Sequence, residues 1–346
     1  MRPNTFAVRG RFHSALIERR GLVWSVGLTA ALLALVCVCA GVGTMWIPPL
    51  EVLRGAVGAG ADTTATVLFS FRLPRAAMSV LAGACLAASG ALLQSVSRNA
   101  LASPDMIGVT GGAAAAGVAF LAVTEGEGGL AWLSLSSIAG AVGMAFLLFA
   151  LAWKRGISPM RLVLIGIALQ TAAASLSSYV IALSPHYLAT QAFTWLTGSV
   201  YGSSWSNVSA LLPWAVGLTA CAWALSRQAN VQELGEDVAI GVGSRTGRDR
   251  TMLLLVSAGL AGAAVSQVGA IGFIGLMAPH MARRLVGPSF GAVLPVSALL
   301  GGMLLLVADT IGRTAFPPND IPAGVFTAAV GAPFFVYLLI KHRKAA

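Results

Sequence analysis

The stretch from Leu22 to Val42 reads LVWSVGLTAALLALVCVCAGV and contains no charged residue. About 20 consecutive apolar residues let one helix cross a bilayer, so this stretch predicts a membrane-spanning helix. The residues before it include Arg2, Arg9, Arg11, Arg19 and Arg20, and such basic flanks are typical of the cytoplasmic side. The run is too long for the core of a secretory signal, and no small-x-small cleavage site precedes a polar mature start. We therefore expect a cytoplasmic basic tail, residues 1–21, before a first transmembrane helix.

The whole chain shares this apolar character. Of its 346 residues, 57% are hydrophobic and 10% are charged, and the mean hydropathy is +0.83. Soluble domains average about 25% charged residues, so this composition excludes a water-soluble globule. The net charge of +10 does not indicate a nucleic acid partner, because the basic residues lie in short stretches between apolar runs. The four cysteines lie inside apolar runs without Cys-x-x-Cys spacing, which favours buried apolar packing over metal or disulfide chemistry.

Further apolar runs, bounded by charge, glycine or proline, continue along the chain. Together with the first they predict ten helices, at residues 22–45, 73–95, 106–124, 130–153, 161–183, 206–227, 250–269, 271–286, 290–312 and 322–341. We expect one all-α polytopic membrane domain over residues 22–341, followed by a short cytoplasmic tail, residues 342–346. In this arrangement the residues from Gly269 to Gly272 must form a tight external turn.

The distribution of positive charge tests this topology, because cytoplasmic loops are rich in Lys and Arg. An even number of helices puts both termini on the same side. With that side cytoplasmic, all of the 22 Lys and Arg residues lie inside except Arg54, Arg72, Arg75 and Arg313. The sequence therefore predicts a multi-pass protein with both termini in the cytoplasm.

Several chemistries have no motif here. None of the three lysines lies in a Gly-x-x-x-x-Gly-Lys-Ser/Thr loop, so the chain lacks the P-loop by which nucleotide phosphates are held. No hydrolase motif occurs either, and we expect no catalytic residue, no metal site and no cofactor. An ion-coupled carrier would place an ionisable group within the membrane, for which Asp309 and His280 are the candidates. Asp309 lies four residues before Arg313, a spacing that favours an ion pair on one helix, and packing is the simpler role for His280.

Three blocks of sequence resemble the FecCD-type iron-chelate permeases, the family that includes the vitamin B12 permease. The first block contains Arg72-Leu-Pro-Arg75, Gly83-Ala84-x-Leu-Ala-x-Ser-Gly90, Gln94, Arg98-Asn-Ala-Leu-Ala-Ser-Pro104 and Gly108-Val-Thr-Gly-Gly112. The second is Gly269-Ala-Ile-Gly-Phe-Ile-Gly-Leu-Met-Ala-Pro-His-Met-Ala-Arg283, and the third contains Ala308-Asp309-x-x-x-Arg313, Ile321-Pro-Ala-Gly324 and Gly331-Ala-Pro-Phe-Phe335. The blocks follow the family's order over residues 70 to 341. Ala100 departs from the pattern, because the family usually has proline there.

The resemblance implies a transmembrane permease of a type II ABC importer, in the bacterial plasma membrane. Its expected partners are two ABC ATPase subunits, an extracytoplasmic substrate-binding protein, and a second copy of the chain or a related permease. ATP would then bind and be hydrolysed on the partner subunit. The substrate implied is a ferric siderophore, with the closest likeness to permeases of the enterobactin type. Haem or cobalamin remains the alternative substrate, and an ion-coupled carrier or a structural scaffold the alternative class.

The resemblance also assigns roles to particular residues. Arg72, Arg75 and Arg313 would receive acidic side chains of the binding protein. The cytoplasmic loop 228–250 has acids at the start and apolar residues after them, which predicts one or two short surface helices. By resemblance this loop couples to the ATPase, through Leu234, Gly235, Glu236, Ala239 and Gly243. The cytoplasmic gate would be formed by Asn99 and Leu101 with Ser158, Pro159 and Met160.

Overall fold

The computed structural model describes residues 5–9, 14–43, 45–56, 62–106, 108–152, 159–316 and 319–343. Eight helices in this part of the chain are long and apolar enough to cross a membrane. They are α1 (Arg19–Gly41), α4 (Leu73–Ser97), α6 (Leu130–Ala152), α7 (Pro159–Leu183), α9 (Trp205–Ala224), α12 (Thr246–Val268), α14 (Phe290–Thr314) and α15 (Ala323–Arg343). Two shorter helices, α5 (Val109–Val123) and α13 (Ile274–Val286), complete the ten that the sequence predicts.

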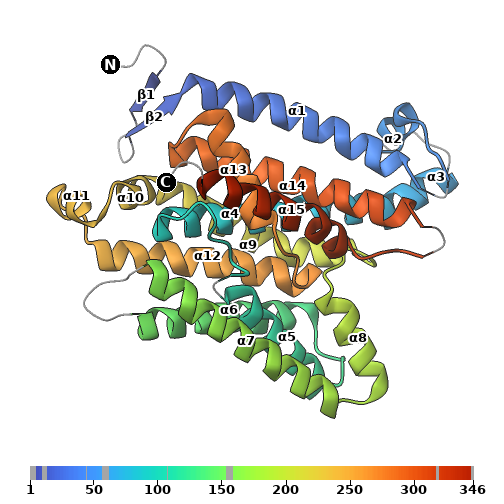
Figure 1. Cartoon of the computed structure of the whole chain (residues 1–346). Coiled ribbons are helices and arrows are strands. Elements are labelled where there is room, and N and C mark those ends of the chain that lie inside the picture. The colour runs from blue at the N-terminus through green and yellow to red at the C-terminus, as the bar shows by residue number, and fades with distance from the viewer. Residues whose placement is uncertain are drawn as a thin grey trace.

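The remaining elements lie at the two ends of this bundle (Figure 1). One end carries α10 (Ser226–Glu233) and α11 (Glu236–Gly241), the end of α15, and a hairpin of β1 (Thr5–Arg9) and β2 (Ser14–Glu18). The other end carries α2 (Pro49–Ala56), α3 (Asp62–Val67) and α8 (His186–Leu196), while the π-helix η1 (Leu68–Arg72) leads into α4. The apolar pattern did not predict the hairpin, which lies outside the membrane runs.

Helices α4 and α12 form the centre of the bundle, and 78% of the most apolar stretch of each is buried. Helix α1 packs beside α14 at the edge and is only 11% buried by the same measure (Figure 1). Two serines join the central pair: the Ser89 hydroxyl donates to the Ser257 carbonyl at 2.8 Å, and the Ser257 hydroxyl donates back to the Ser89 carbonyl at 3.0 Å. Such interhelical hydrogen bonds stabilise membrane bundles. Lipid tails are as apolar as the helix surfaces, so apolar burial gives little driving force for helices to associate.

Glycines set the closest helix approaches. A Cβ on Gly112 of α5 would lie 2.5 Å from the Met144 Cβ and 2.6 Å from the Gly140 carbonyl oxygen, both on α6. Gly83 of α4 meets the Gly301 backbone of α14, and Gly90 of α4 meets the Gly275 backbone of α13. These small residues let helix backbones touch, which is how van der Waals packing replaces the hydrophobic effect in lipid.

The connection between α12 and α13 differs from the expected tight external turn. Helix α12 ends at Val268 and α13 begins at Ile274, so five residues, Gly269 to Phe273, are not helical. The start of α13 lies against Gly90, well along α4, and Phe273 packs on Gly331 near the middle of α15. The segment therefore runs from the α8 end of the bundle into its interior. Helix α13 has 13 residues and is about 20 Å long, shorter than the roughly 30 Å bilayer core.

Candidate functional site

The three arginines proposed for docking lie at the α2–α3 end of the bundle, and Arg75 is enclosed by acids. Its guanidinium donates to Asp309 of α14, with Nη2 to Oδ1 at 2.7 Å, and to Asp320, with Nη1 to Oδ2 at 2.6 Å. The Asp309 side chain is 3% exposed and that of Arg75 15%. The Tyr201 ring lies beneath, 5.6 Å from the guanidinium carbon. Arg75 thus joins α4 to α14 and to the segment before α15.

Arg72 and Arg313 converge on the C-terminal end of α1. Arg72 donates through Nη1 to the Ala40 and Gly41 carbonyls and through Nη2 to that of Met45. Arg313 donates to the Val42 carbonyl at 2.6 Å and to the Cys39 carbonyl. The last carbonyls of a helix have no intrahelical partner, and a cation there also complements the helix dipole. Both arginines therefore cap α1 within the chain.

The expected pairing of Asp309 with Arg313 is wrong. Among the residues that the structure describes, Asp309 forms its ion pair with Arg75, which lies on another helix. Four-residue spacing puts two side chains on one face, but the packing of α4 against α14 brings a closer guanidinium, and Arg313 turns to the α1 carbonyls instead.

The coupling loop forms two short helices, as the sequence predicts. A turn at Gly235, with φ of 107°, joins α10 to α11, and only glycine adopts such a conformation without strain. Ala239 is buried, whereas Leu234, Val238, Ile240 and Val242 are each about half exposed or more. The loop is fixed to α12 by Arg250, which donates to Gln232 at 2.9 Å and pairs with Glu236 at 3.3 Å. Helices α10 and α11 therefore form a projection that carries exposed apolar side chains and is fixed to α12, here called the α10–α11 projection.

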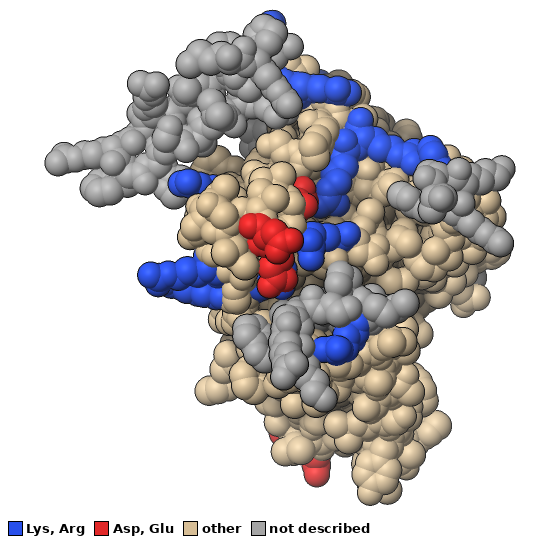
Figure 2. Space-filling view, turned by 60° about the vertical axis from the view of Figure 1, so that its left-hand side comes forward, with Lys and Arg blue, Asp and Glu red and all other residues tan. Residues whose placement is uncertain are grey.

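This projection stands at the basic end of the bundle. Figure 2 shows Lys and Arg side chains surrounding a small acidic group there. Exposed basic residues of this end include Arg19, Arg20, Arg98, Arg227, Arg245, Arg248, Arg284 and Lys341. The asymmetry agrees with the positive-inside rule if this end is cytoplasmic.

Two of the proposed gate residues lie directly after α4. Arg98 caps α4 in the left-handed region, with φ of 51°. The Asn99 side-chain oxygen accepts from the Leu101 N–H at 2.9 Å, and both residues are half-buried. Ser158 lies outside the described residues, and Pro159 and Met160 are described only as the first turn of α7. The proposed gate of five residues therefore stays a prediction.

A charged network beside the Asn99 turn was not singled out from the sequence. Arg283 of α13 donates to Glu233, the last residue of α10, at 2.9 Å, and to the Gln94 side chain of α4. The Ser95 hydroxyl donates to the same Glu233 oxygen at 2.7 Å. A cavity of about 220 Å³ is lined by Gln94, Arg98, Asn99, Ala100, Glu233 and Arg283. Glu233 lies in the predicted cytoplasmic loop and Arg283 near the end of a predicted helix, but their pairing spans 50 residues and depends on the fold.

A second feature missed from the sequence is the interior end of α13. Phe273 has φ of 68°, in the left-handed region that a bulky residue rarely adopts, and its N–H donates to Asp105 Oδ2 at 3.2 Å. Non-helical backbone within a membrane must find such partners, because lipid supplies none. Asp105 thus anchors the break between α12 and α13.

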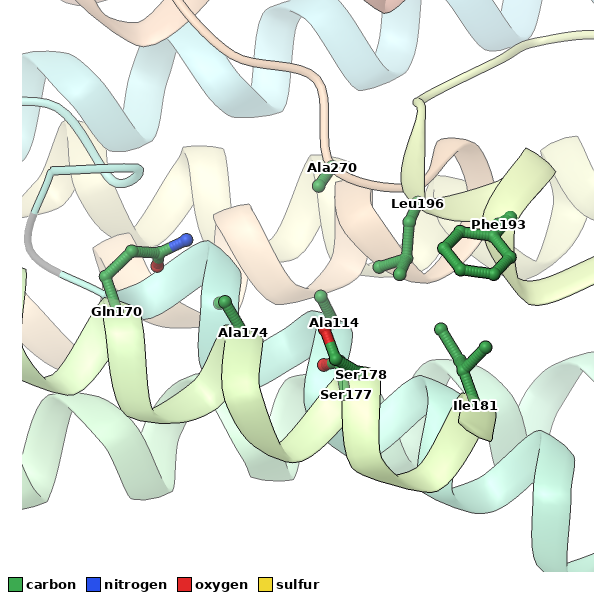
Figure 3. A pocket seen from close by; sticks show the side chains of 10 residues that line it. Ala114, Gln170, Ala174, Ser177, Ser178, Ile181, Phe193, Leu196 and Ala270 are labelled. Atoms are coloured by element: carbon green, nitrogen blue, oxygen red, sulfur yellow. The ribbon is translucent and has the colours of Figure 1, made fainter. Parts of the chain in front are cut away.

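A cavity of about 180 Å³ lies between α5, α7, α8 and Ala270 of the same break. Figure 3 shows Ser177 and Ser178 of α7 near Ala114 of α5, with Phe193 and Leu196 of α8 also lining the space. Pockets for drug-sized ligands measure about 300 to 1,000 Å³, so this space does not enclose a metal chelate. No cluster of three or more His, Cys, Asp or Glu side chains suited to a metal occurs among the described residues.

Comparison with known proteins agrees with the architecture. Residues 31–341 match the FecCD transport family. The chain is 47% identical over 325 residues to a Bacillus subtilis protein named "Probable siderophore transport system permease protein YfhA", covering 92% of this chain and 94% of that one. It is 41% identical over 345 residues to the achromobactin transport system permease protein CbrC of Dickeya dadantii, covering 97% and 99%. A solved structure titled "An inward-facing conformation of a putative metal-chelate type ABC transporter" matches with TM-score 0.80 and 30% identity over 92% of this chain and 98% of that one.

Proposed function

This chain belongs to the FecCD transport family and is a membrane-spanning permease subunit of the iron-chelate ABC transporters, and we propose that it imports a ferric siderophore into a bacterial cell. The two similar permeases serve siderophore transport, one of them achromobactin. An iron that arrives already chelated needs no metal ligands along its path. The substrate assignment therefore rests on the similarity across nearly the whole chain.

Energy would come from ATP hydrolysis on two partner ATPase subunits, because the sequence has no P-loop of its own. The observation that supports this best is the α10–α11 projection. Its exposed apolar side chains stand on a buried base and suit the hydrophobic centre of an interface. We assign Leu234, Gly235, Glu236 and Gly243 to the ATPase contact, with the buried Ala239 supporting them from within the projection. This orientation puts the α10–α11 end, and both termini, in the cytoplasm.

The remaining partners follow from the same family. An extracytoplasmic binding protein would deliver the chelate to the α2–α3 end. A second permease copy, or a related permease, would complete the pathway, with Asn99 and Leu101 near its cytoplasmic exit. Helices α7 and α15 are only 22% and 28% buried in their most apolar stretches, so each has a free apolar face for a second permease or lipid.

The test is uptake by proteoliposomes that contain the permease, its ATPase and its binding protein. Radio-iron complexes of hydroxamate, catecholate and citrate type are offered, with cobalamin and haem as the alternative substrates. We expect ATP-dependent uptake of one iron-chelate class. Val238→Glu and Ile240→Glu place charge on the exposed projection and should abolish uptake without affecting membrane insertion. Uptake driven by an ion gradient in vesicles without ATPase would contradict the proposal and favour a secondary carrier.

A further inference from the structure

The short helix α13 contacts neighbouring helices at both of its ends and at its centre. Its last turn holds Arg283, its centre holds His280, and Phe273 directly precedes its first residue. Arg283 contacts α10 and α4, whereas His280 and Phe273 contact two positions on α15. A rigid element with distinct attachments can pass displacement from one to another.

The cytoplasmic attachment joins α13 to the coupling projection. Arg283 Nη2 and Glu233 Oε1 are 2.9 Å apart, with side chains 21% and 24% exposed. Because both groups are largely removed from water, their attraction is screened less than that of a surface pair. Glu233 is the last residue of α10 and immediately precedes the turn at Leu234 and Gly235 that leads into α11. Any movement of α10 therefore acts directly on the last turn of α13.

The interior attachments join α13 to α15. The His280 ring meets the Phe334 ring edge to face, with centroids 5.7 Å apart. The Phe273 ring lies on Gly331, where a Cβ would overlap it. The strained backbone of Phe273 is held by the Asp105 carboxylate. Displacement of α13 therefore reaches α15 at two points about one helical turn apart.

We propose that the Arg283–Glu233 ion pair transmits movement of the α10–α11 projection to α13 and, through Phe273 and His280, to α15. The inference rests on the proposed contact between this projection and an ATPase. Arg283 and Glu233 are positioning residues: they contact neither substrate nor nucleotide, and they set where α13 lies when the projection moves. The pair thereby links ATP hydrolysis to the opening of the pathway.

The experiment measures uptake and ATP hydrolysis together in the reconstituted importer, using the chelate that the unaltered protein transports. Glu233→Gln and Arg283→Gln should leave hydrolysis at its normal rate but lower the chelate transported per ATP by about tenfold, a typical size for coupling between two sites. Exchange of the charges, Glu233→Arg with Arg283→Glu, should restore part of that ratio. Arg284→Gln is the matched control, since Arg284 is the next residue, is exposed and takes no part in the network.

Each outcome has a separate meaning. An unchanged ratio in both single variants overturns the inference. A parallel fall of uptake and hydrolysis, with less assembled complex by size-exclusion chromatography, also overturns it, because it shows only a structural role. Phe273→Ala should lower the ratio in the same way if α15 receives the movement. Failure of the unaltered importer to transport any chelate would instead refute the proposed function.

Discussion

At the scale of single residues, Arg75 is held by geometry that lysine cannot reproduce. Its planar guanidinium offers five N–H donors in a fixed fork, and it donates to both oxygens of Asp309 and both of Asp320. An ammonium group could contact one of these carboxylates well, but not both. Because Asp309 is buried, loss of Arg75 would leave its carboxyl group without the ion-pair partner that it has in the structure. Arg75 therefore acts as a clamp that joins α4 to α14 and to the segment before α15.

Removal of the guanidinium should destabilise the fold. We expect Arg75→Leu to lower the free energy of unfolding by about 3 to 5 kcal/mol, because Asp309 is left buried without its partner. The double variant Arg75→Leu with Asp309→Leu should recover much of this loss, since neither charge remains. Thermal unfolding in detergent measures both. A single variant as stable as the unaltered protein, or a double variant no better than the single, would contradict the clamp.

The sequence predicts features that depend on residues close together in the chain, but it does not predict which distant residues pair. Arginines on the external side were identified because charge asymmetry is a local count along the chain. The partner of Asp309 was not, because four-residue spacing on α14 is visible in the sequence while a contact 234 residues away is not. The pairing of Arg283 with Glu233 was missed for the same reason.

At the scale of helices, the packing of α5 on α6 depends on reciprocal glycines. Gly112 meets the Gly140 carbonyl, and Gly140 meets the Gly112 backbone and Ala116. Gly108 and Gly112 lie four residues apart, and such spacing of small residues favours close approach of membrane helices. The partner helix of α5 could not be predicted, because the same spacing occurs on several helices.

A pair of alanine substitutions on α6 tests this contact. Gly140→Ala should cost about 1 to 3 kcal/mol, because the new methyl group overlaps the α5 backbone. Gly143→Ala should be neutral or slightly stabilising, because nothing lies within 4 Å of its added Cβ and alanine favours helix. Midpoints of thermal unfolding in detergent compare the two. Equal midpoints would show that α5 and α6 are not in close contact.

The break between α12 and α13 shows where hydropathy fails. Gly269 to Phe273 continues the apolar run, so composition predicts helix or a tight turn. The structure instead ends α12 with Gly269, whose φ is 71°, and holds Phe273 by Asp105. A carboxylate that comes from a distant loop decides this local conformation. Broken helices in membranes often surround a functional path, which suits the proposed role of α13.

At the scale of the whole molecule, charge separates the two ends. Exposed basic residues gather around α10 and α11 (Figure 2), while Arg72, Arg75 and Arg313 at the α2–α3 end bind α1 carbonyls or Asp309 and Asp320. Intrachain roles thus explain three of the four exceptions to the positive-inside rule, whereas Arg54 of α2 is exposed. Docking of a binding protein to Arg72, Arg75 and Arg313 remains a proposal, and a carboxylate of that partner must share donors already in use.

Arg72 offers the sharpest test of docking, because it is half-buried and one of its three acceptors, the Met45 carbonyl, is at the exposed side. Arg72→Glu places like charge opposite an acidic partner, so we expect binding of the binding protein to weaken by about tenfold. The loss should be larger at low salt, where exposed charges are least screened. Titration of the binding protein onto detergent-solubilised importer at two salt concentrations measures it. Arg72→Gln separates the loss of the α1 cap from charge reversal, and Arg284→Glu makes the same reversal at the opposite end. The Arg72→Glu variant must first be shown to unfold at the normal temperature. If it then binds the binding protein as tightly at low salt as Arg284→Glu does, Arg72 only caps α1 and takes no part in docking.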